Sequence, residues 1–223
     1  MICQSNSLFV WGLFLFFPDH PLWQEILSEN YTRFMVVRHP MTRFLSAYWD
    51  KMYTTDKNSL YHLIRTQLLR NARPDLTKQQ VESLIPTFQE FVAYRMLHYL
   101  PYSTERHWGS IIKLCRPCTF RYHYTFKLET IKQEIQPILR RLVSKNITYE
   151  HLASMIVPKN IKSRKSFSLS AMNGKVIEEY MNLTLQQRKD IGKVFKKDME
   201  MFGYHFNPWT AAVEYDVNEC NNE

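Results

Sequence analysis

Residues 31–52, YTRFMVVRHPMTRFLSAYWDKM, decide the expected fold of this chain. The segment 31–38 is short, apolar and β-branched near its end, which predicts a buried strand of an α/β sheet. His39-Pro40 then breaks the strand, because a residue before proline favours extended geometry. Apolar side chains recur at helical spacing from residue 44 to residue 52, with Thr42 as the expected N-cap. The stretch predicts a strand, a tight turn and a helix.

Hydrophobic periodicity predicts further helices and loops. A second amphipathic helix is marked by four apolar residues, Leu60, Leu63, Ile64 and Leu68. A loop at residues 71–75 follows, and then a short helix that ends before Pro86. Residues 159–175 are basic and Ser-rich without periodicity, which predicts a surface loop.

Two further helices begin with the capping-box pattern, in which Thr is followed three residues later by Glu or Gln. Thr87 and Glu90 form this pattern at the start of one helix. Thr184 and Gln187 form it at the start of a long helix that Gly203 can end.

The overall pattern indicates one α/β domain. Residues 120–126 alternate aromatic and polar side chains, as a strand with one buried face does. Strands that alternate with helices are typical of the α/β class. The 223 residues suffice for one domain with a sizeable core. We assign residues 30–223 to it, and residues 1–29 to an apolar N-terminal segment without an assigned role.

The charge balance favours polyanionic partners. The chain has 29 Lys and Arg against 21 Asp and Glu, a formal net charge of +8. Nucleic acid, anionic membranes, acidic glycans and nucleotide phosphates all fit such a surface. The apolar run at residues 8–17 is shorter than the roughly 20 residues that a membrane-spanning helix needs, and no Lys or Arg precedes it.

The cysteine pattern bears on metal binding, and the N-glycosylation sequons bear on the cellular compartment. Cys115 and Cys118 form the one C-x-x-C pair, without a second pair at zinc-ligand spacing. This pattern favours a local disulfide or two buried thiols over a metal site, and we expect no metal. Three N-x-[ST] sequons, at Asn30, Asn146 and Asn182, would carry glycans only in a lumenal chain.

The first candidate site is a phosphate site at the turn between the predicted strand and helix. Arg38 stands at the carboxyl end of the strand, and Arg43 and Ser46 lie three residues apart on one face of the helix. A helix N-terminus offers unpaired N–H groups and a positive dipole end. A planar guanidinium can bind a phosphate bidentately. A structural ion pair at Arg38 and a surface position for Ser46 are the alternatives.

Residues 31–52 closely resemble the segment of Golgi carbohydrate sulfotransferases, such as the chondroitin and dermatan 4-O-sulfotransferases, that grips the 3′-phosphate of the donor. The resemblance continues in order along the chain and covers about residues 30–204. It includes TFQEFVAY at 87–94, Arg106-His107-Trp108, LCRPCTFRYHYTFKLET at 114–130 and KKDMEMFGY at 196–204.

The resemblance implies a function, a donor and a fold. It implies a P-loop-like sulfotransferase fold with a central parallel sheet flanked by helices. The sulfuryl donor would be 3′-phosphoadenosine 5′-phosphosulfate (PAPS), gripped by Arg38 and Ser46. The acceptor would be a glycosaminoglycan or glycoprotein glycan of chondroitin type, and no nucleic-acid partner is expected. The expected location is the Golgi lumen, in a type II membrane topology.

Sulfuryl transfer also needs a base for the proton of the acceptor hydroxyl. His107, inside a family-like segment, is the first candidate, and His39 beside the phosphate grip is the second. Glu129 is less favoured. The loop cations Lys162, Arg164 and Lys165 could contact the nucleotide or an anionic glycan. A packed, hydrogen-bonded His107 and a solvated cation cluster are the alternatives.

One family feature has no counterpart in this sequence. Family members carry, upstream of the 3′-phosphate strand, a Lys-bearing loop that holds the 5′-phosphosulfate. Only 30 residues precede Tyr31 here, and the first Lys is Lys51. We therefore expect an N-terminally incomplete domain, with any anchor missing or partial. A non-catalytic nucleotide or glycan binder and a basic nucleic-acid-binding module remain the competing hypotheses.

Overall fold

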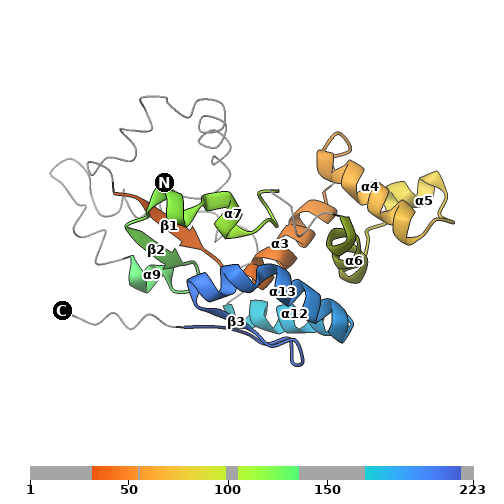
Figure 1. Ribbon diagram of the computed structural model, residues 1–223. Helices are drawn as coiled ribbons and strands as arrows, with labels where there is room; N and C mark the ends of the chain where they lie inside the picture. The colour runs from red at the N-terminus through yellow and green to blue at the C-terminus, as the bar shows by residue number, and fades with distance from the viewer. Residues whose placement is uncertain (1–31, 55, 99–104, 136–168, 217–223) are drawn as a thin grey trace. The chain divides into compact units, whose positions relative to one another are not determined.

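The computed structural model describes residues 32–54, 56–98, 105–135 and 169–216 (Figure 1). The chain divides into two compact units. The first includes residues 32–38 and 115–135, and the second includes the described residues from 39 to 114 and from 170 to 216. Each unit has buried apolar side chains of its own.

The first unit contains a two-stranded parallel sheet. β1 (Phe34–Val37) pairs in parallel with β2 (Tyr124–Lys127). Two short helices flank β2 in the sequence, α8 (Pro117–Phe120) and α9 (Ile131–Glu134). One buried cluster of this unit contains Phe126, Ile131 and Ile135, and Met35 and Val37 of β1 are buried as well. The strand predicted within residues 31–38 is thereby confirmed, and a parallel partner is found for it.

The strand predicted at residues 120–126 begins later than expected. Phe120 ends α8, and β2 begins only at Tyr124. Arg116 and Arg121, on either side of α8, both have left-handed backbone geometry, with φ of 43° and 44°. The turn at Arg121 therefore interrupts the segment where a continuous strand was expected, and the aromatic alternation misled the prediction.

The second unit is mainly helical. Its helices, in chain order, are α3 (Pro40–Met52), α4 (Leu60–Ala72), α5 (Lys78–Ser83), α6 (Phe88–His98), α7 (Ile111–Cys115), α12 (Leu169–Met181) and α13 (Leu185–Phe202). An antiparallel hairpin of β3 (Tyr204–Phe206) and β4 (Val213–Tyr215) follows α13. α3, α6 and α13 pack on one another, and α4 packs on α3 and α6 (Figure 1).

Aromatic rings from four helices fill the core of the second unit. The ring centre of Phe44 lies 5.2 Å from that of Phe91 and 5.8 Å from that of Phe195. Tyr180 meets Phe88 edge-on at 5.1 Å. Burial of a large apolar side chain stabilises the fold by roughly 1.5–3 kcal/mol, so these rings contribute much of the packing energy between α3, α6, α12 and α13.

The helix after the first strand begins earlier than predicted. Its N-cap is His39, whose Nδ1 accepts a hydrogen bond from the backbone N–H of Met41 at 3.2 Å. Pro40 occupies the first helical turn, where its missing N–H costs nothing. Thr42 lies inside the helix and donates its hydroxyl hydrogen to the carbonyl of His39 at 2.9 Å. The expected N-cap role of Thr42 is therefore wrong.

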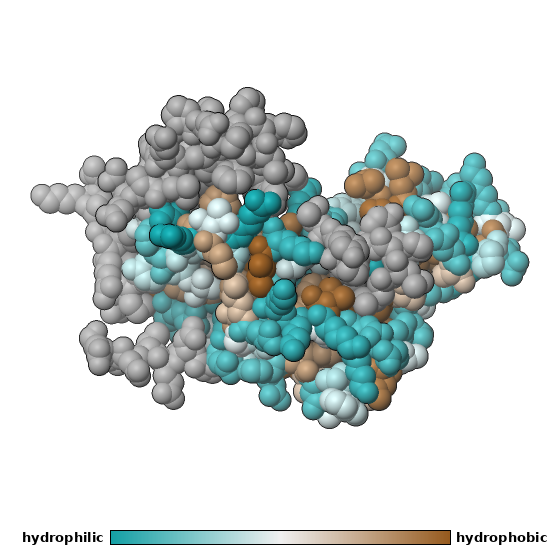
Figure 2. Space-filling view, viewed as in Figure 1, coloured by the Kyte–Doolittle hydropathy of each residue, from teal (hydrophilic) through white to brown (hydrophobic). Residues whose placement is uncertain are grey.

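The predicted second helix is present as α4; of the four apolar residues that mark it, Leu68 is buried, whereas Leu60 and Leu63 are not. Leu60 and Leu63 are 63% and 61% exposed, and Figure 2 shows apolar side chains gathered on the surface over α4. Arg65 is buried instead and donates to the carbonyls of Met52 at 3.2 Å and Thr54 at 3.1 Å. These bonds to the end of α3 and the residues after it fix which side of α4 faces inward.

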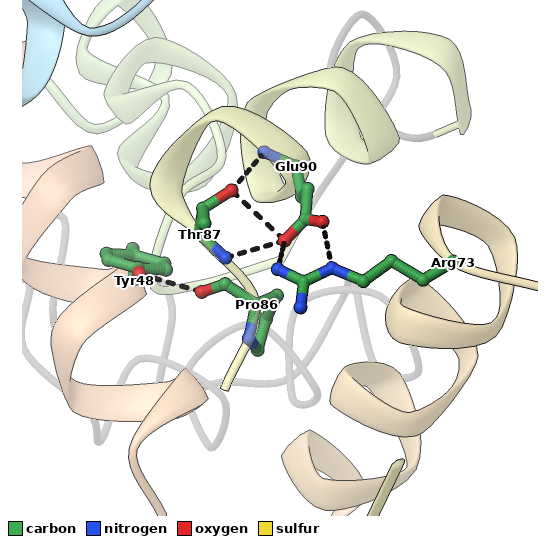
Figure 3. Close-up of polar contacts among 5 residues, drawn as sticks. All are labelled: Tyr48, Arg73, Pro86, Thr87 and Glu90. Carbon is green, nitrogen blue, oxygen red and sulfur yellow. Dashed lines mark hydrogen bonds and ion pairs between the residues drawn. The ribbon is translucent and has the colours of Figure 1, made fainter. Parts of the chain in front are cut away.

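Both predicted capping boxes are confirmed. Glu90 accepts from the N–H of Thr87 at 2.7 Å, and Thr87 accepts from the N–H of Glu90 at 3.2 Å (Figure 3). Arg73 adds two hydrogen bonds to the same carboxylate, at 2.6 and 3.0 Å. At the start of α13, Thr184 and Gln187 bond in the same reciprocal way. Gly203 ends α13 with φ of 61°, a left-handed geometry that suits glycine.

Some predicted boundaries are wrong. α4 continues to Ala72, through the start of the loop expected at residues 71–75. α12 begins at Leu169, so the end of the loop expected at 159–175 is helical. The apolar run at residues 8–17 lies outside the described residues. Among the helices that are described, none is both long enough and apolar enough to cross a bilayer.

The expectation of a local disulfide is also corrected. Cys115 is disulfide-bonded, whereas Cys118 carries a free and exposed thiol. The two cysteines of the C-x-x-C pair are therefore not joined to each other.

Candidate functional site

The two residues expected to grip the donor phosphate lie just after the strand and in the helix that follows it. Arg38 directly follows β1, and Ser46 lies in the middle of α3; both side chains are half-buried. Arg38 ends the first unit, whereas Ser46 belongs to the second, so each is described within its own unit. Their joint contact with a phosphate stays a prediction.

His39 has the contacts of a helix cap. Its side chain is buried, and its Nδ1 accepts from the N–H of Met41. The hydrogen-bond network therefore assigns the ring proton to Nε2, which lies 2.9 Å from the carbonyl oxygen of His205 and donates to it. Because both ring nitrogens are engaged with the backbone, a role as proton acceptor would require one of these bonds to break.

Arg43 holds the loop that carries His107. Its guanidinium donates to the backbone carbonyls of His107 at 3.3 Å and of Arg106 at 3.5 Å, and also to that of Gly109. Planar guanidinium groups suit such multiple donation because their N–H groups are fixed in a fork. These contacts make Arg43 a positioning residue for the loop, and its expected contact with the donor stays a prediction.

Glu105 fixes the same loop from its amino-terminal side. Its carboxylate accepts from the N–H of His107 at 2.7 Å and from that of Trp108 at 3.2 Å. Trp108 is fully buried and packs edge-on against Phe91 at 5.7 Å. The loop is therefore held by charge-assisted bonds on two sides and by a buried indole ring.

His107 combines burial with an unused ring nitrogen. Its Nε2 is buried and has no hydrogen-bond partner within the part of the chain that the structure describes. Burial lowers the pKa of His107; the nearby Glu105 opposes this shift, and Lys51 and Arg106 reinforce it. The imidazole is consequently neutral at pH 7, which is the form that can accept a proton.

Tyr61 and Lys51 lie beside this imidazole. The ring centre of Tyr61 is 5.4 Å from that of His107, and its hydroxyl donates to Glu105 at 3.0 Å. Burial and then the charge of Glu105 raise the pKa of Tyr61 to about 12, so its hydroxyl stays protonated. Lys51 Nζ lies 4.8 Å from the centre of the Tyr61 ring. The histidine thus has a hydroxyl, a carboxylate and a cation in its surroundings.

A buried carboxylate on α13 fixes the far end of the loop. Asp198 accepts from the hydroxyl of Ser110 at 2.6 Å and from the N–H groups of Ile111 at 2.7 Å and Ile112 at 3.1 Å. Asp198 is 1% exposed, so these bonds replace its lost hydration. It supplies partners for the otherwise unpaired N–H groups at the start of α7.

Sequence reasoning singled out His107 as a candidate but did not point to the residues that surround it. Tyr61, Lys51 and Asp198 come from three different helices, and no local pattern connects them with residues 105–110. Of these residues, Glu105 could most readily have been predicted from the sequence. An acidic residue two positions before a histidine can accept a hydrogen bond from the backbone N–H of that histidine.

The remaining candidates lie elsewhere. Glu129 lies in the turn after β2, in the first unit, whereas His107 belongs to the second. Lys162, Arg164 and Lys165 lie outside the described residues.

Comparison with known proteins identifies the family. A family model described as "Sulfotransferase family" matches residues 12–205, which is most of the chain. The chain therefore belongs to the sulfotransferase family.

Curated relatives narrow the class. The chain is 29% identical over 180 residues to carbohydrate sulfotransferase 9 of Homo sapiens, and the aligned region covers 79% of this chain and 38% of that protein. It is 27% identical over 192 residues to carbohydrate sulfotransferase 12 of Xenopus laevis, covering 81% and 41%. It is 26% identical over 180 residues to carbohydrate sulfotransferase 11 of Rattus norvegicus, covering 79% and 47%.

The chain thus spans less than half the length of these relatives. No solved structure gives a significant match.

Proposed function

We propose that this chain is a carbohydrate sulfotransferase that uses His107 as the base of the reaction. The observation that carries the proposal is the neutral imidazole of His107, whose buried Nε2 has no partner among the described residues. Family membership supplies the reaction class, and the printed names of the relatives supply a carbohydrate acceptor.

The proposed donor is PAPS. In the reaction, the acceptor hydroxyl oxygen forms a bond to sulfur, and the bond between sulfur and the bridging oxygen of the 5′-phosphate breaks. The hydroxyl proton moves to Nε2 of His107. The products are a sulfate ester and adenosine 3′,5′-bisphosphate, with the proton on the imidazole before its release to solvent. Each atom and charge is thereby accounted for without a metal ion.

Arg38 and Ser46 are proposed to hold the 3′-phosphate of this donor. A guanidinium and a hydroxyl together offer charge-assisted hydrogen bonds to the phosphate oxygens. Arg38 follows the parallel strand β1 and Ser46 lies on the helix after it, the order of elements in which phosphates bind at strand ends. A P-loop-like fold, with a central parallel sheet flanked by helices, is part of this proposal.

The proposed acceptor is a glycosaminoglycan or glycoprotein glycan of chondroitin type, and the proposed location is the Golgi lumen, with membrane association through an anchor. The formal net charge of +8 fits an anionic polysaccharide, because such a surface attracts polyanions over long range. Desulfated chondroitin and a neutral N-linked glycan distinguish the two acceptor classes in a transfer assay.

Nucleotide binding tests the donor half of the proposal. Calorimetry with adenosine 3′,5′-bisphosphate is expected to show binding to the full chain, and Arg38→Ala and Ser46→Ala should each weaken it at least about tenfold. Arg70→Ala, which removes an exposed cation from α4, is the matched control and should bind as the parent does. Equal affinity of all four proteins, or stronger retention on single-stranded DNA than on the nucleotide, would overturn the proposal.

A further inference from the structure

We propose that Asn182 is an N-glycosylation site whose glycan covers an exposed apolar patch at the shared end of α12 and α13. The inference rests on the lumenal location contained in the proposed function. Asn182, Leu183 and Thr184 form an N-x-T sequon, and all three lie in the turn between the two helices. The other two sequons, at Asn30 and Asn146, lie outside the described residues.

The turn presents Asn182 outward while it buries its neighbour. Asn182 is exposed, whereas Leu183 is 3% exposed and anchors the turn in the core. The backbone N–H of Asn182 donates to the carbonyl of Glu178 at 3.3 Å, which continues the end of α12. The side chain at this position thus extends from the surface, where a glycan needs no space inside the protein.

Arg188 fixes the backbone of the same turn. Its buried guanidinium donates to the carbonyls of Tyr180 at 3.2 Å, Met181 at 3.2 Å and Leu183 at 2.7 Å. The carbonyl of Tyr180 also accepts from the backbone N–H of Leu183 at 3.1 Å, so backbone and side-chain bonds hold the turn together. The turn is therefore held by bonds of Arg188 and of the backbone, and within the described residues no hydrogen bond from the Asn182 side chain contributes to it.

Exposed apolar side chains precede and follow the acceptor along the chain. Ile177 and Met181 are 37% and 47% exposed and lie one helical turn apart on α12. Leu185, at the start of α13, is 37% exposed on the other side of the turn. Figure 2 shows apolar surface at this end of α12. A glycan on Asn182 would stand among these three side chains and shield them from other molecules.

Variants of Thr184 separate the sequon from the helix cap. Thr184 is both the third residue of the sequon and the N-cap of α13. Thr184→Ser keeps both functions, and Thr184→Asp keeps a good N-cap but destroys the sequon. Asn182→Gln destroys the sequon at its exposed end and leaves the cap untouched.

The test expresses the full chain behind a cleavable secretory leader, with a reporter sequon in a C-terminal tag that shows entry into the lumen. The tryptic peptide of residues 176–188 contains Asn182 and no other sequon. After release of glycans by peptide N-glycosidase in heavy-oxygen water, this peptide should carry labelled aspartate at position 182 in the parent and in Thr184→Ser. It should be unlabelled in Thr184→Asp and Asn182→Gln.

An unlabelled peptide from parent chains whose reporter is glycosylated would overturn the proposal. Asn182→Gln should also increase binding of an apolar dye several-fold, and unchanged dye binding would overturn the shielding role. Nucleotide affinity should be unchanged in every variant, because Asn182 and Thr184 are exposed residues of the turn and none of the variants replaces Arg38 or Ser46. If the parent transfers no sulfate, the glycosylation result can still be interpreted, because it does not depend on sulfotransferase activity.

Discussion

Arg43 donates a hydrogen bond from its guanidinium to the backbone carbonyl of His107 at 3.3 Å, so the cation of the phosphate-site motif holds the loop of the candidate base. The relationship links two family segments that lie more than 60 residues apart in the sequence. It also separates two possible roles of Arg43, because positioning of a loop and contact with the donor predict different results.

Replacement of Arg43 tests the positioning role. Arg43→Ala removes the donors to the loop, and we expect faster amide hydrogen exchange at residues 107–109. Sulfate transfer should fall roughly a hundredfold, as a small misplacement of a reacting group can cost that much. Arg70→Ala serves as the matched control. If Arg43→Ala weakened nucleotide binding and left exchange at the loop unchanged, Arg43 would be a donor contact instead.

The pKa of His107 gives a second prediction. Burial lowers this pKa, with Lys51 adding to the shift, so the ring should titrate below the ordinary histidine value of about 6.5. Lys51→Met removes a repelling cation and should raise the pKa. NMR titration of the imidazole signal, assigned through its loss in His107→Gln, measures both.

The same shift has a consequence for stability. Since the folded pKa lies below the unfolded one, the unfolded chain binds more protons in the window between them. Stability contributed by neutral His107 is present above the ordinary pKa and is lost as the pH falls through the folded value. A titration midpoint above that of a free histidine peptide would contradict this account.

The Glu90 network predicts acid sensitivity. Burial would raise the pKa of Glu90, but hydrogen bonds from Arg73 and Thr87 outweigh it and hold the pKa below its ordinary value. Its stabilising effect should be complete above about pH 4.3 and lost as the pH falls through the lower, folded value. Glu90→Gln should reduce the free energy of unfolding by about 1–3 kcal/mol at pH 7.

Denaturant titrations at pH 7 and at low pH check this prediction. The difference between parent and Glu90→Gln should shrink as the pH is lowered. Glu82→Gln, on the exposed surface of α5, is the control and should show little difference at either pH. A gap that stays constant with pH would argue against a charged Glu90 as its source.

Asp198 should be more sensitive to substitution than other acids on α13. Asp198→Ala leaves a hydroxyl and two backbone N–H groups without their acceptor, and we expect a loss of roughly 2–4 kcal/mol in unfolding free energy. Asp190→Ala, at a less buried site on the same helix, should lose less than about 1 kcal/mol. Thermal or denaturant unfolding of both variants measures the contrast, and equal losses would refute the special role of Asp198.

The sequence was sufficient for features that depend on neighbouring residues. The strand before Arg38, both capping boxes and the glycine end of α13 follow from local patterns, and each is confirmed. The predicted N-cap of α3 was wrong because the helix begins earlier, where the His39 side chain accepts from the backbone N–H of Met41. The expected buried face of α4 was wrong in part, because the charged Arg65 is buried and donates hydrogen bonds to carbonyls.

The site shows the same division between local and distant information. His107 became a candidate through its segment, but its lowered pKa depends on burial by other parts of the chain. The bonds from Asp198 and Arg43 to the loop span separations that periodicity cannot detect. Such contacts arise only when α3, α13 and the loop are packed together.

Transfer of radiolabelled sulfate from PAPS to desulfated chondroitin by the full chain tests the central claim most directly. The account predicts incorporation by the parent and a loss of at least about a hundredfold in His107→Gln, with the affinity for adenosine 3′,5′-bisphosphate unchanged. Absence of incorporation by a folded, nucleotide-binding parent, or full transfer by His107→Gln, would contradict it.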